Sequence, residues 1–474
     1  MSADAMVVGS GPNGLAAAVT LARSGLAVHV IEGAETPGGG CRTAELTLPG
    51  FRHDVCSAVH PLAAASPFFR QLDLAALGVA LRTPKVAFAH PLDGGRAAWL
   101  AGSVDETAGN LGADGAAYRR LLEPLVRDAT LTLPDVLAPL RSVPGHPLAM
   151  ARFGLDGLPP ASLLVRRFRS PETRAMFAGA AAHTMRPLTA PVTGAFGLTL
   201  MIIAHAVGWP VVEGGSARLV DALVAELTSL GGTLETGRWV TSLADLPAAR
   251  AVLLDVTPRQ LVALAGESIG ARSRRTLERF RYGTGVCKVD WALSGPVPWQ
   301  AAPCREAGTV HVGGTFAEVA RGEADVNAGR HPDRPFCLVA QPGVVDPTRA
   351  PAGHCTLWGY CHVPAGSSVD MSGRIEAQIE RFAPGFTDLI LARSVRTAAD
   401  MERYNPNYVG GDINGGAATL RQTFFRPTLR WNPYRTPLPG VYLCSSSTPP
   451  GGGVHGMCGL GAARTALADL GVKT

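Results

Sequence analysis

Lysine is nearly absent from this 474-residue chain, because only three of its 43 basic residues are lysines. Charged residues make up 17% and aromatic residues 6% of the sequence, whereas 46% is hydrophobic. This composition excludes a disordered chain and predicts well-buried globular domains, and the length favours two of them. The formal net charge of +5 is small and not clustered, which argues against a nucleic-acid partner.

Paired cysteine motifs and long apolar runs are also missing. The nine cysteines are scattered and contain no C-x-x-C pair, so we expect free thiols and neither a disulfide framework nor a metal site. No apolar run reaches the roughly 18 residues of a membrane span, and the longest covers residues 195–204. The first strand is expected to start by Ala5, which leaves no room for a signal peptide. We therefore expect a cytoplasmic protein.

The most informative stretch is residues 5–32, in which an apolar strand runs into a glycine-rich turn, a helix of small residues and a second strand. Gly9 permits the tight turn, Gly11 lets a pyrophosphate approach the backbone, and Gly14 lets the helix pack closely on the strand. Glu32 ends the second strand, where a carboxylate accepts the ribose hydroxyls and repels a 2′-phosphate. The expected dinucleotide-binding residues of this unit are Gly9, Gly11, Pro12, Asn13, Gly14 and Glu32.

A second glycine cluster, residues 38–40, helps to decide whether this unit binds FAD or NAD. Glycines there let the backbone pass close to a bulky ligand beyond the pyrophosphate, and Arg42 is placed to neutralise a phosphate or meet a ribityl oxygen. A simple NAD domain has no reason for this cluster. It favours FAD, with Gly39, Gly40 and Arg42 as further contacts.

The rest of the chain predicts a discontinuous organisation. Residues 208–259 return to a helix and strand pattern, and a strand, a glycine-rich turn and a helix over about 456–470 close the chain. We assign 1–59, 208–259 and 404–474 to the nucleotide domain, and 60–207 with 260–403 to a substrate domain. Expected helices cover 115–127 and 161–179, and expected strands cover 237–243, 251–255, 285–293 and 355–363.

Several blocks together resemble the phytoene desaturase and carotenoid isomerase-related branch of FAD-dependent oxidoreductases, within the wider group that includes monoamine oxidases. These blocks are the N-terminal fingerprint, the Gly-Gly helix at 214, YNPN from Tyr404, FFRP at 424–427 and PGGGVHGMCG from Pro450. The tail is most similar to the subgroup typified by pyridine nucleotide-disulfide oxidoreductase domain-containing protein 2. One departure is Ser445-Ser446, where related flavoproteins often carry a carboxylate.

The resemblance implies an α/β fold: a Rossmann-like FAD-binding domain of the glutathione reductase/amine oxidase type with a discontinuous α+β substrate domain. It implies that FAD lies across the nucleotide domain with its ring facing a cavity roofed by the second domain. Further cofactor contacts implied in this way are Val240, Ser446, Gly452, Gly453 and Val454.

Two side chains are the candidates for catalysis. In the amine oxidase relatives a lysine on a strand comparable to 285–293 approaches flavin N5 through water, and Lys288 stands out in a chain that otherwise uses arginine. Alternation places Lys288 and Asp290 on one face, so Asp290 is the expected counter-ion of a buried Lys288. His455 precedes the last helix and either acts near the flavin or caps the helix. His60, His183 and His205 are interpreted as core or loop residues.

Two further groups of residues are candidates for contact with the substrate or with a membrane. Tyr404, Asp412 and Asn414 belong to a glycine-rich loop that we interpret as facing the substrate, although such residues are also ordinary in turns. Arg166, Arg167 and Arg169 follow an apolar stretch. They predict either peripheral contact with an anionic membrane or an ordinary solvated helix face.

The leading hypothesis is an FAD-dependent oxidoreductase that takes hydride from a small apolar, polyene-like or lipid-like substrate to flavin N5. The cofactor carries the redox chemistry, and the protein holds and orients both partners. No second G-x-G-x-x-G motif is present for NAD(P)H, so oxygen or a quinone is the expected electron acceptor. Alternatives are a redox-neutral FAD-dependent isomerase, an amine oxidase and a flavin-binding regulatory protein of low turnover.

Overall fold

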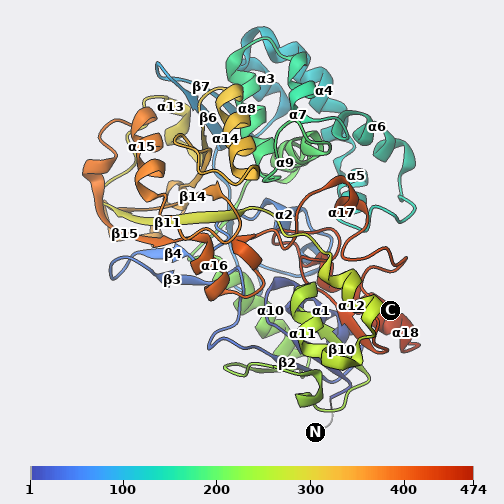
Figure 1. Ribbon diagram of the computed structural model, residues 1–474. Coiled ribbons are helices and arrows are strands. Elements are labelled where there is room, and N and C mark those ends of the chain that lie inside the picture. Colours follow the sequence, from blue (N-terminus) through green and yellow to red (C-terminus); the bar gives the residue numbers. More distant parts are fainter. Residues whose placement is uncertain (1–2, 473–474) are drawn as a thin grey trace.

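The computed structural model describes residues 3–472, and within that range two larger sheets of different kinds form the core. The first is a parallel sheet in the order β16-β10-β1-β2-β9. Because neighbouring strands come from distant parts of the sequence, the chain returns to this layer twice after leaving it (Figure 1). Its strands are β1 (Ala5–Val8), β2 (Val28–Ile31), β9 (Thr233–Glu235), β10 (Ala251–Leu254) and β16 (Val441–Leu443).

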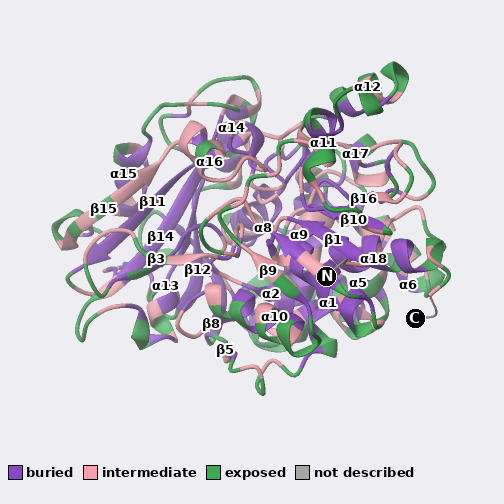
Figure 2. Ribbon diagram, turned by 90° about the horizontal axis from the view of Figure 1, so that it is seen from below, coloured by how far each residue is buried: buried purple, intermediate pink, exposed green. Residues whose placement is uncertain are grey.

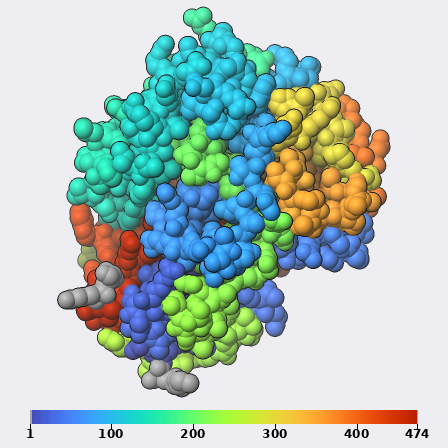
Figure 3. All heavy atoms as spheres, turned by 180° about the vertical axis from the view of Figure 1, so that it is seen from behind, coloured from blue at the N-terminus to red at the C-terminus, as the bar shows by residue number. Residues whose placement is uncertain are grey.

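Helices cover both faces of this parallel sheet. On one face lie α1 (Pro12–Arg23), α10 (Ala217–Ser229) and α18 (Met457–Asp469), which share one apolar core with β1, β2 and β10. α18 packs so closely on α1 that a Cβ on Gly459 would overlap the carbonyl oxygen of Asn13, and the dark red and dark blue segments are adjacent in Figure 3. On the other face, α11 (Pro258–Ala265) and α12 (Ala271–Glu278) pack on β10 and β16.

The second sheet is mixed and larger, in the order β15-β11-β14-β13-β12-β6-β7. Its centre is buried on both sides: β11 and β14 are almost fully enclosed, whereas α12 of the other layer is largely exposed (Figure 2). The strands are β6 (Val86–Leu92), β7 (Arg96–Ala101), β11 (Gly285–Leu293), β12 (Ala307–Val312), β13 (Cys337–Ala340), β14 (Cys355–Val363) and β15 (Ile390–Arg396). They come from two segments separated by about 180 residues.

A helical layer lies against one end of this sheet and above the nucleotide layer in Figure 1. Its helices are α2 (Pro61–Ala65), α3 (Val104–Asn110), α4 (Gly115–Arg127), α5 (Ala129–Val136), α6 (Pro147–Gly157), α7 (Ala161–Leu164), α8 (Pro171–Ala182) and α9 (Thr193–Val207). The remaining elements are α13 (Ala302–Arg305), α14 (Phe316–Asn327), α15 (Ser372–Phe382), α16 (Ala398–Tyr404), α17 (Leu420–Phe424) and the two-stranded pairs β3 (Thr43–Glu45) with β4 (Arg52–Asp54) and β5 (Leu81–Arg82) with β8 (Val211–Val212).

Several elements begin and end where the sequence predicts. The strands expected over 285–293 and 355–363 and the helix over 115–127 have those bounds. The strand expected over 237–243 is wrong: the strand is β9, which ends at Glu235, and Gly237 follows in a turn with a φ of +72°. The helix expected over 161–179 is interrupted before Pro171, where Phe168 and Ser170 are extended. The expected domain boundary at 259 falls inside α11, which packs on the parallel sheet.

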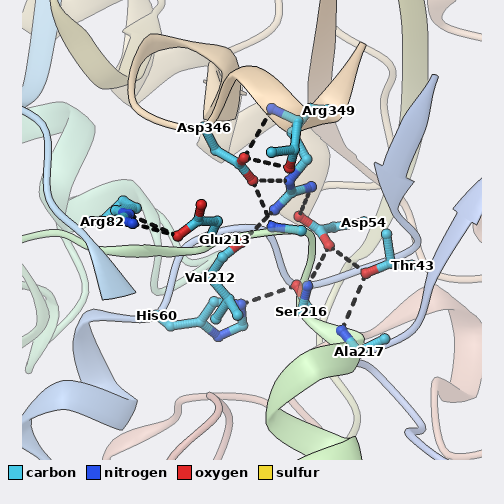
Figure 4. A network of polar contacts seen from close by, with 12 residues as sticks. Thr43, Asp54, His60, Arg82, Val212, Glu213, Ser216, Ala217, Asp346 and Arg349 are labelled. Atoms are coloured by element: carbon cyan, nitrogen blue, oxygen red, sulfur yellow. Dashed lines mark hydrogen bonds and ion pairs between the residues drawn. The ribbon is translucent and has the colours of Figure 1, made fainter. Parts of the chain in front are cut away.

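A buried ion network joins the two layers (Figure 4). Arg349, which is 1% exposed, donates from Nε to Asp346 at 2.6 Å and from Nη1 to Asp54 at 2.8 Å. Asp54 also accepts the backbone N–H of Ser216 just before α10 and the hydroxyl of Thr43. The guanidinium therefore connects the loop after β13 to β4 and to the start of a nucleotide-layer helix.

Candidate functional site

The turn between β1 and α1 brings the backbone of the first helix against the sheet. Gly9 has a φ of +99°, a conformation that favours glycine. A Cβ on Gly14 would overlap the carbonyl oxygen of Gly9, so a larger residue would push the helix away from the strand. Pro12 occupies the first helical turn, and the buried Oδ1 of Asn13 has no hydrogen-bond partner among the described residues. This is a helix N-terminus shaped to receive an anion.

Glu32 lies at the end of β2, as expected for a ribose-binding carboxylate. One of its oxygens accepts the N–H and the hydroxyl of Ser10 at 2.8 and 2.7 Å, and the other accepts the N–H of Ala34 at 2.9 Å. Arg42 lies 3.6 Å from it and otherwise holds the carbonyls of Thr36 and Pro37. The predicted Arg42 is thus an anchor for the glycine loop beside Glu32.

Three cavities follow one another from this turn. The first, of about 350 Å³, is lined by Gly9, Glu32, Arg42, Val240 and Tyr404 and fits an adenosine group in position and chemistry. The second, of about 270 Å³, is lined by the predicted cofactor residues Pro12, Asn13, Gly39, Gly40, Ser446, Gly452, Gly453 and Val454, whereas Gly14 lines neither cavity. Gly11 and Gly39 line both, and a Cβ on Gly39 would lie 3.1 Å from the Cα of Gly11. The glycines therefore keep open a continuous cradle that fits a dinucleotide.

The third cavity, of about 320 Å³, is mainly apolar and meets the second one. Leu62, Phe196, Leu200, Asn414 and Gly452 line both. Its outer part is formed by α5, α6, α9 and α17, which belong to the helical layer and to the C-terminal segment. A substrate in this cavity would lie end to end with a ligand in the second.

The structure places Lys288 behind a cavity wall. Its ammonium is 1% exposed, pairs with Asp290 as expected, and lies 5.5 Å from the ring centroid of Trp358. Trp358 and Tyr360, which pair across with Asp290 and Lys288 on β14, line the second cavity, whereas Lys288 does not. Burial lowers the pKa of Lys288 and raises the pKa of Asp290. The rings of Trp358 and Tyr360 form the cavity wall, so Lys288 does not directly face the space in which a cofactor would bind.

His455 lies on the wall of the apolar cavity, but both ring nitrogens are occupied. Nδ1 accepts the N–H of Met457 at 3.0 Å, and Nε2 donates to the carbonyl of Gly451 at 3.1 Å. Burial lowers the pKa of His455 to about 4, so the ring is neutral at neutral pH. This geometry corresponds to the capping interpretation, in which His455 fixes the turn that leads into α18.

The three residues of the expected substrate loop separate in space. Tyr404 lines the adenosine-side cavity, donates to the carbonyl of Gly39 at 3.0 Å and lies under Arg42 and Arg396. Asp412 is buried and accepts three backbone N–H groups, from Gly283, Asn414 and Gly416. Only Asn414 of this group lies where the second and third cavities meet. Tyr404 and Asp412 hold loops through these hydrogen bonds, and their contact with a substrate stays a prediction.

Asp255 is the cofactor-site residue that sequence reasoning missed. It follows β10, lines the first and second cavities, and accepts the N–H of Gly14 at 3.0 Å. Burial raises the pKa of Asp255 to about 7, and the nearby charge of Glu32 adds to this. Ligands in parallel α/β folds bind at the carboxyl ends of strands, and Asp255 comes directly after such a strand. That position was the available signal.

The raised pKa of Asp255 predicts a pH-dependent stability. Since the folded state disfavours the charged carboxylate, the contribution of Asp255 to stability falls as pH rises from about 4 to about 7 and then levels off. Asp255→Asn keeps an acceptor for the Gly14 N–H and should remove this fall, gaining roughly 2–4 kcal/mol over wild type above pH 7. Urea unfolding at several pH values, at equal cofactor content, measures the difference. The prediction is contradicted if the difference in unfolding free energy between Asp255→Asn and wild type is the same at pH 4 and pH 8. The exposed Asp221→Asn is the control for the loss of one charge.

One histidine on the wall of the second cavity forms a close pair with another buried histidine. His183 lines this cavity, and its Nε2 lies 3.0 Å from Nε2 of His311. Burial lowers the pKa of His183 to about 3, so both rings are neutral. No sequence signal distinguished His183 from the core histidines, because its position depends on α8 packing against β12. Across residues 3–472 no group of His, Cys, Asp and Glu is arranged to hold a metal, and the nine cysteines are free thiols.

The comparisons agree with this architecture. Residues 7–72 match the family model of the NAD(P)-binding Rossmann-like domain. The chain is 27% identical over 561 residues to pyridine nucleotide-disulfide oxidoreductase domain-containing protein 2 of Rattus norvegicus, with 98% of this chain and 94% of the relative covered. It is 34% identical over 131 residues to 4,4'-diapolycopen-4-al dehydrogenase of Metabacillus indicus, which covers 26% of each chain. Putrescine oxidase bound to putrescine has a TM-score of 0.59 at 17% identity, with 100% of both chains covered.

These similarities confirm the predicted fold class. The chain has the Rossmann-like FAD-binding oxidoreductase fold with mixed α/β sheets, as in amine oxidase structures. Among the described helices, none is both long and apolar enough to cross a membrane.

Proposed function

We propose that this protein is an FAD-dependent oxidoreductase that dehydrogenates an apolar, polyene-like or lipid-like substrate. The observation that carries the proposal is the meeting of an apolar cavity with a glycine-lined dinucleotide cradle at Asn414 and Gly452. When bound, FAD supplies the hydride-accepting centre, and oxygen or a quinone is the proposed final acceptor.

The residues of this chain bind, orient and exclude water. Gly11 and the first turn of α1 would hold the pyrophosphate region, Asp255 fixes that turn by accepting the Gly14 N–H, and Glu32 would hold the ribose. Ser446 would face the ribityl chain in place of a carboxylate, and its Oγ lies 3.3 Å from Nδ2 of Asn13. Phe196 and Leu200 line both cavities and present apolar side chains where the cavities meet.

Amine oxidation is the second candidate, and a specific observation favours it. Trp358 and Tyr360 form an edge-to-face pair on the wall of the second cavity, with ring centroids 5.2 Å apart, and aromatic walls attract cations. Putrescine oxidase and cyclohexylamine oxidase of Brevibacterium oxydans share this fold. The apolar lining of the third cavity ranks this candidate second.

A flavin spectrum tests the proposal. The purified protein should be yellow and should release FAD on acid precipitation, and anaerobic addition of a polyene or acyl substrate should bleach it. Bleaching by amines alone would favour the second candidate, whereas bound FAD with no bleaching by any of these classes would favour a regulatory flavoprotein or an isomerase. A colourless protein that takes up no added FAD contradicts the proposal.

We also propose peripheral contact with an anionic membrane, at its cytoplasmic face. Of the predicted arginines, Arg167 pairs with Asp156 of α6 at 2.7 Å. The same helix exposes Leu148 by 88% and Leu155 by 79% beside the outer part of the apolar cavity. This pair places Arg167 beside α6, and basic and apolar side chains close together on one surface are typical of interfacial binding.

Replacing both leucines with glutamate should therefore weaken binding to vesicles of anionic phospholipid by about tenfold or more at low salt. Cosedimentation with the vesicles measures this. The exposed Val369→Glu is the control and should bind as wild type does. Equal binding of the double variant would contradict the membrane contact.

A further inference from the structure

A buried guanidinium lies on the wall of the otherwise apolar third cavity. Arg426, directly after α17, is 5% exposed. Among the described residues that line this cavity, it is the only one of type Asp, Glu, Lys or Arg. An arginine keeps its charge inside proteins, so the cavity carries one fixed positive charge.

Carbonyl oxygens, and not a carboxylate, surround this guanidinium. Nε donates to Gln422 at 3.3 Å, Nη1 to Ser446 at 3.2 Å and Nη2 to Gly416 at 3.1 Å. Within residues 3–472 no acidic side chain lies within 4 Å of it. The neighbouring Asp412 turns its oxygens to three backbone N–H groups instead. A buried charge without a counter-ion is costly, so an anion at this position would be stabilising.

The guanidinium has both unused donors and space. Of its five N–H groups, three serve the carbonyls and one on each terminal nitrogen remains. Two glycines keep side chains away from these nitrogens: a Cβ on Gly451 would overlap Nη1, and one on Gly416 would lie 3.4 Å from Nη2. Two parallel N–H groups match the two oxygens of a carboxylate.

We propose that the apolar cavity binds a carboxylate-bearing apolar chain, with Arg426 binding the carboxylate. This names a substrate class for the proposed oxidoreductase and rests on that function for the reaction, though not for the binding. Because Arg426 contacts Ser446, which lines the second cavity, the carbons next to the carboxylate lie nearest the dinucleotide cradle. The far end of the chain lies among the side chains of α5, α6 and α9.

Binding of cis-parinaric acid, which becomes fluorescent in apolar surroundings, tests the assignment, with its methyl ester as the uncharged comparator. The protein as purified should bind the acid about tenfold or more tightly than the ester. Arg426→Met should bind acid and ester alike, and Arg426→Lys, which keeps the charge but not the fork, should keep part of the preference. Arg421→Met removes an exposed arginine of the neighbouring helix α17 and should keep all of the preference.

Three results would overturn the assignment: equal binding of acid and ester by wild type, an unchanged preference in Arg426→Met, or a preference that disappears when FAD is added to apoprotein. The last result would mean that Arg426 faces the cofactor. Should Arg426→Met fail to fold, the wild-type comparison and Arg426→Lys still decide. A colourless protein that prefers the acid would refute the proposed oxidoreductase function and support the carboxylate site. A yellow protein without the preference would support a flavoprotein and refute the carboxylate site.

Discussion

Replacing Arg349 with methionine is expected to lower the free energy of unfolding by about 3–5 kcal/mol or more, because it leaves two buried carboxylates without their cation. Asp54 and Asp346 lie 2.8 and 2.6 Å from the guanidinium, and both are buried. Methionine has a similar apolar volume, so lost charge and not an empty space causes the effect. Urea unfolding followed by circular dichroism measures it.

The matched control is Arg82→Met, at the exposed ion pair with Glu213 that Figure 4 shows beside the network. Exposed pairs contribute little, so this change should stay within about 1 kcal/mol. If Arg349→Met does not accumulate as folded protein, adding Asp54→Asn and Asp346→Asn should restore part of the stability by removing the unpaired charges. Equal stabilities of Arg349→Met and Arg82→Met would contradict the role given to the network.

Acid should reduce the difference between wild type and Arg349→Met. Hydrogen bonds and the Arg349 charge hold the pKa of both Asp54 and Asp346 below the usual value despite burial. The stability that these carboxylates contribute is present above their unfolded pKa of about 4 and is lost as pH falls through their folded values. The variant lacks that contribution, so the two proteins should converge at low pH.

Replacing Gly14 with alanine is expected to weaken FAD binding by about tenfold or more, the second large effect. The added Cβ would overlap the carbonyl oxygen of Gly9 and approach the Cβ of Asp255 at 3.2 Å. The Gly9 carbonyl is backbone, and a Cβ does not move when a side chain changes rotamer, so α1 must move and its N–H groups leave the cradle. Flavin absorbance per mole of protein, after incubation with FAD, measures the loss.

Gly109→Ala is the matched control, because it adds a Cβ inside α3 with nothing within 4 Å and should leave flavin content unchanged. Should Gly14→Ala unfold, Gly11→Ala is the second variant. Its Cβ meets only the Asp255 carboxylate, at 2.8 Å, and projects into the cradle, so the fold should survive while the flavin is lost. Full flavin content in both glycine variants would contradict the placement of the cofactor.

Sequence motifs predicted much of the cofactor cradle, but they did not predict the roles of Asp255 and Arg426. Gly9, Gly11, Gly14 and Glu32 act through backbone geometry within about 25 residues, and the spacing of such residues is visible in a sequence. Asp255 depends on a partner 241 residues away, and the partners of Arg426, although at most 20 residues away, are backbone carbonyls that no spacing motif links to it. Their roles arise only when β10 lies beside β1 and when the Arg426 loop meets the turn after β16.

Burial also decided the outcome for the proposed catalytic residues. The alternation on 285–293 correctly put Lys288 and Asp290 on one face. Alternation does not reveal what stands opposite, and here Trp358 and Tyr360 of β14 occupy the cavity wall. Likewise, the segment after Gly237 looked like a strand by its apolar residues, but Arg238 donates its backbone N–H to Glu32 and the chain crosses the end of β2.

The arrangement of the parallel sheet sets an order for biosynthesis. β1 and α1 leave the ribosome first, but their neighbours β10 and β16 and the covering helix α18 come roughly 240 to 450 residues later. Until α18 packs on α1, the side of α1 that carries Asn13, Ala16 and Ala17 has no cover. A nascent chain of this protein therefore carries an unfinished nucleotide domain, with apolar surface and strand edges open to aggregation, until β10, β16 and α18 have been made.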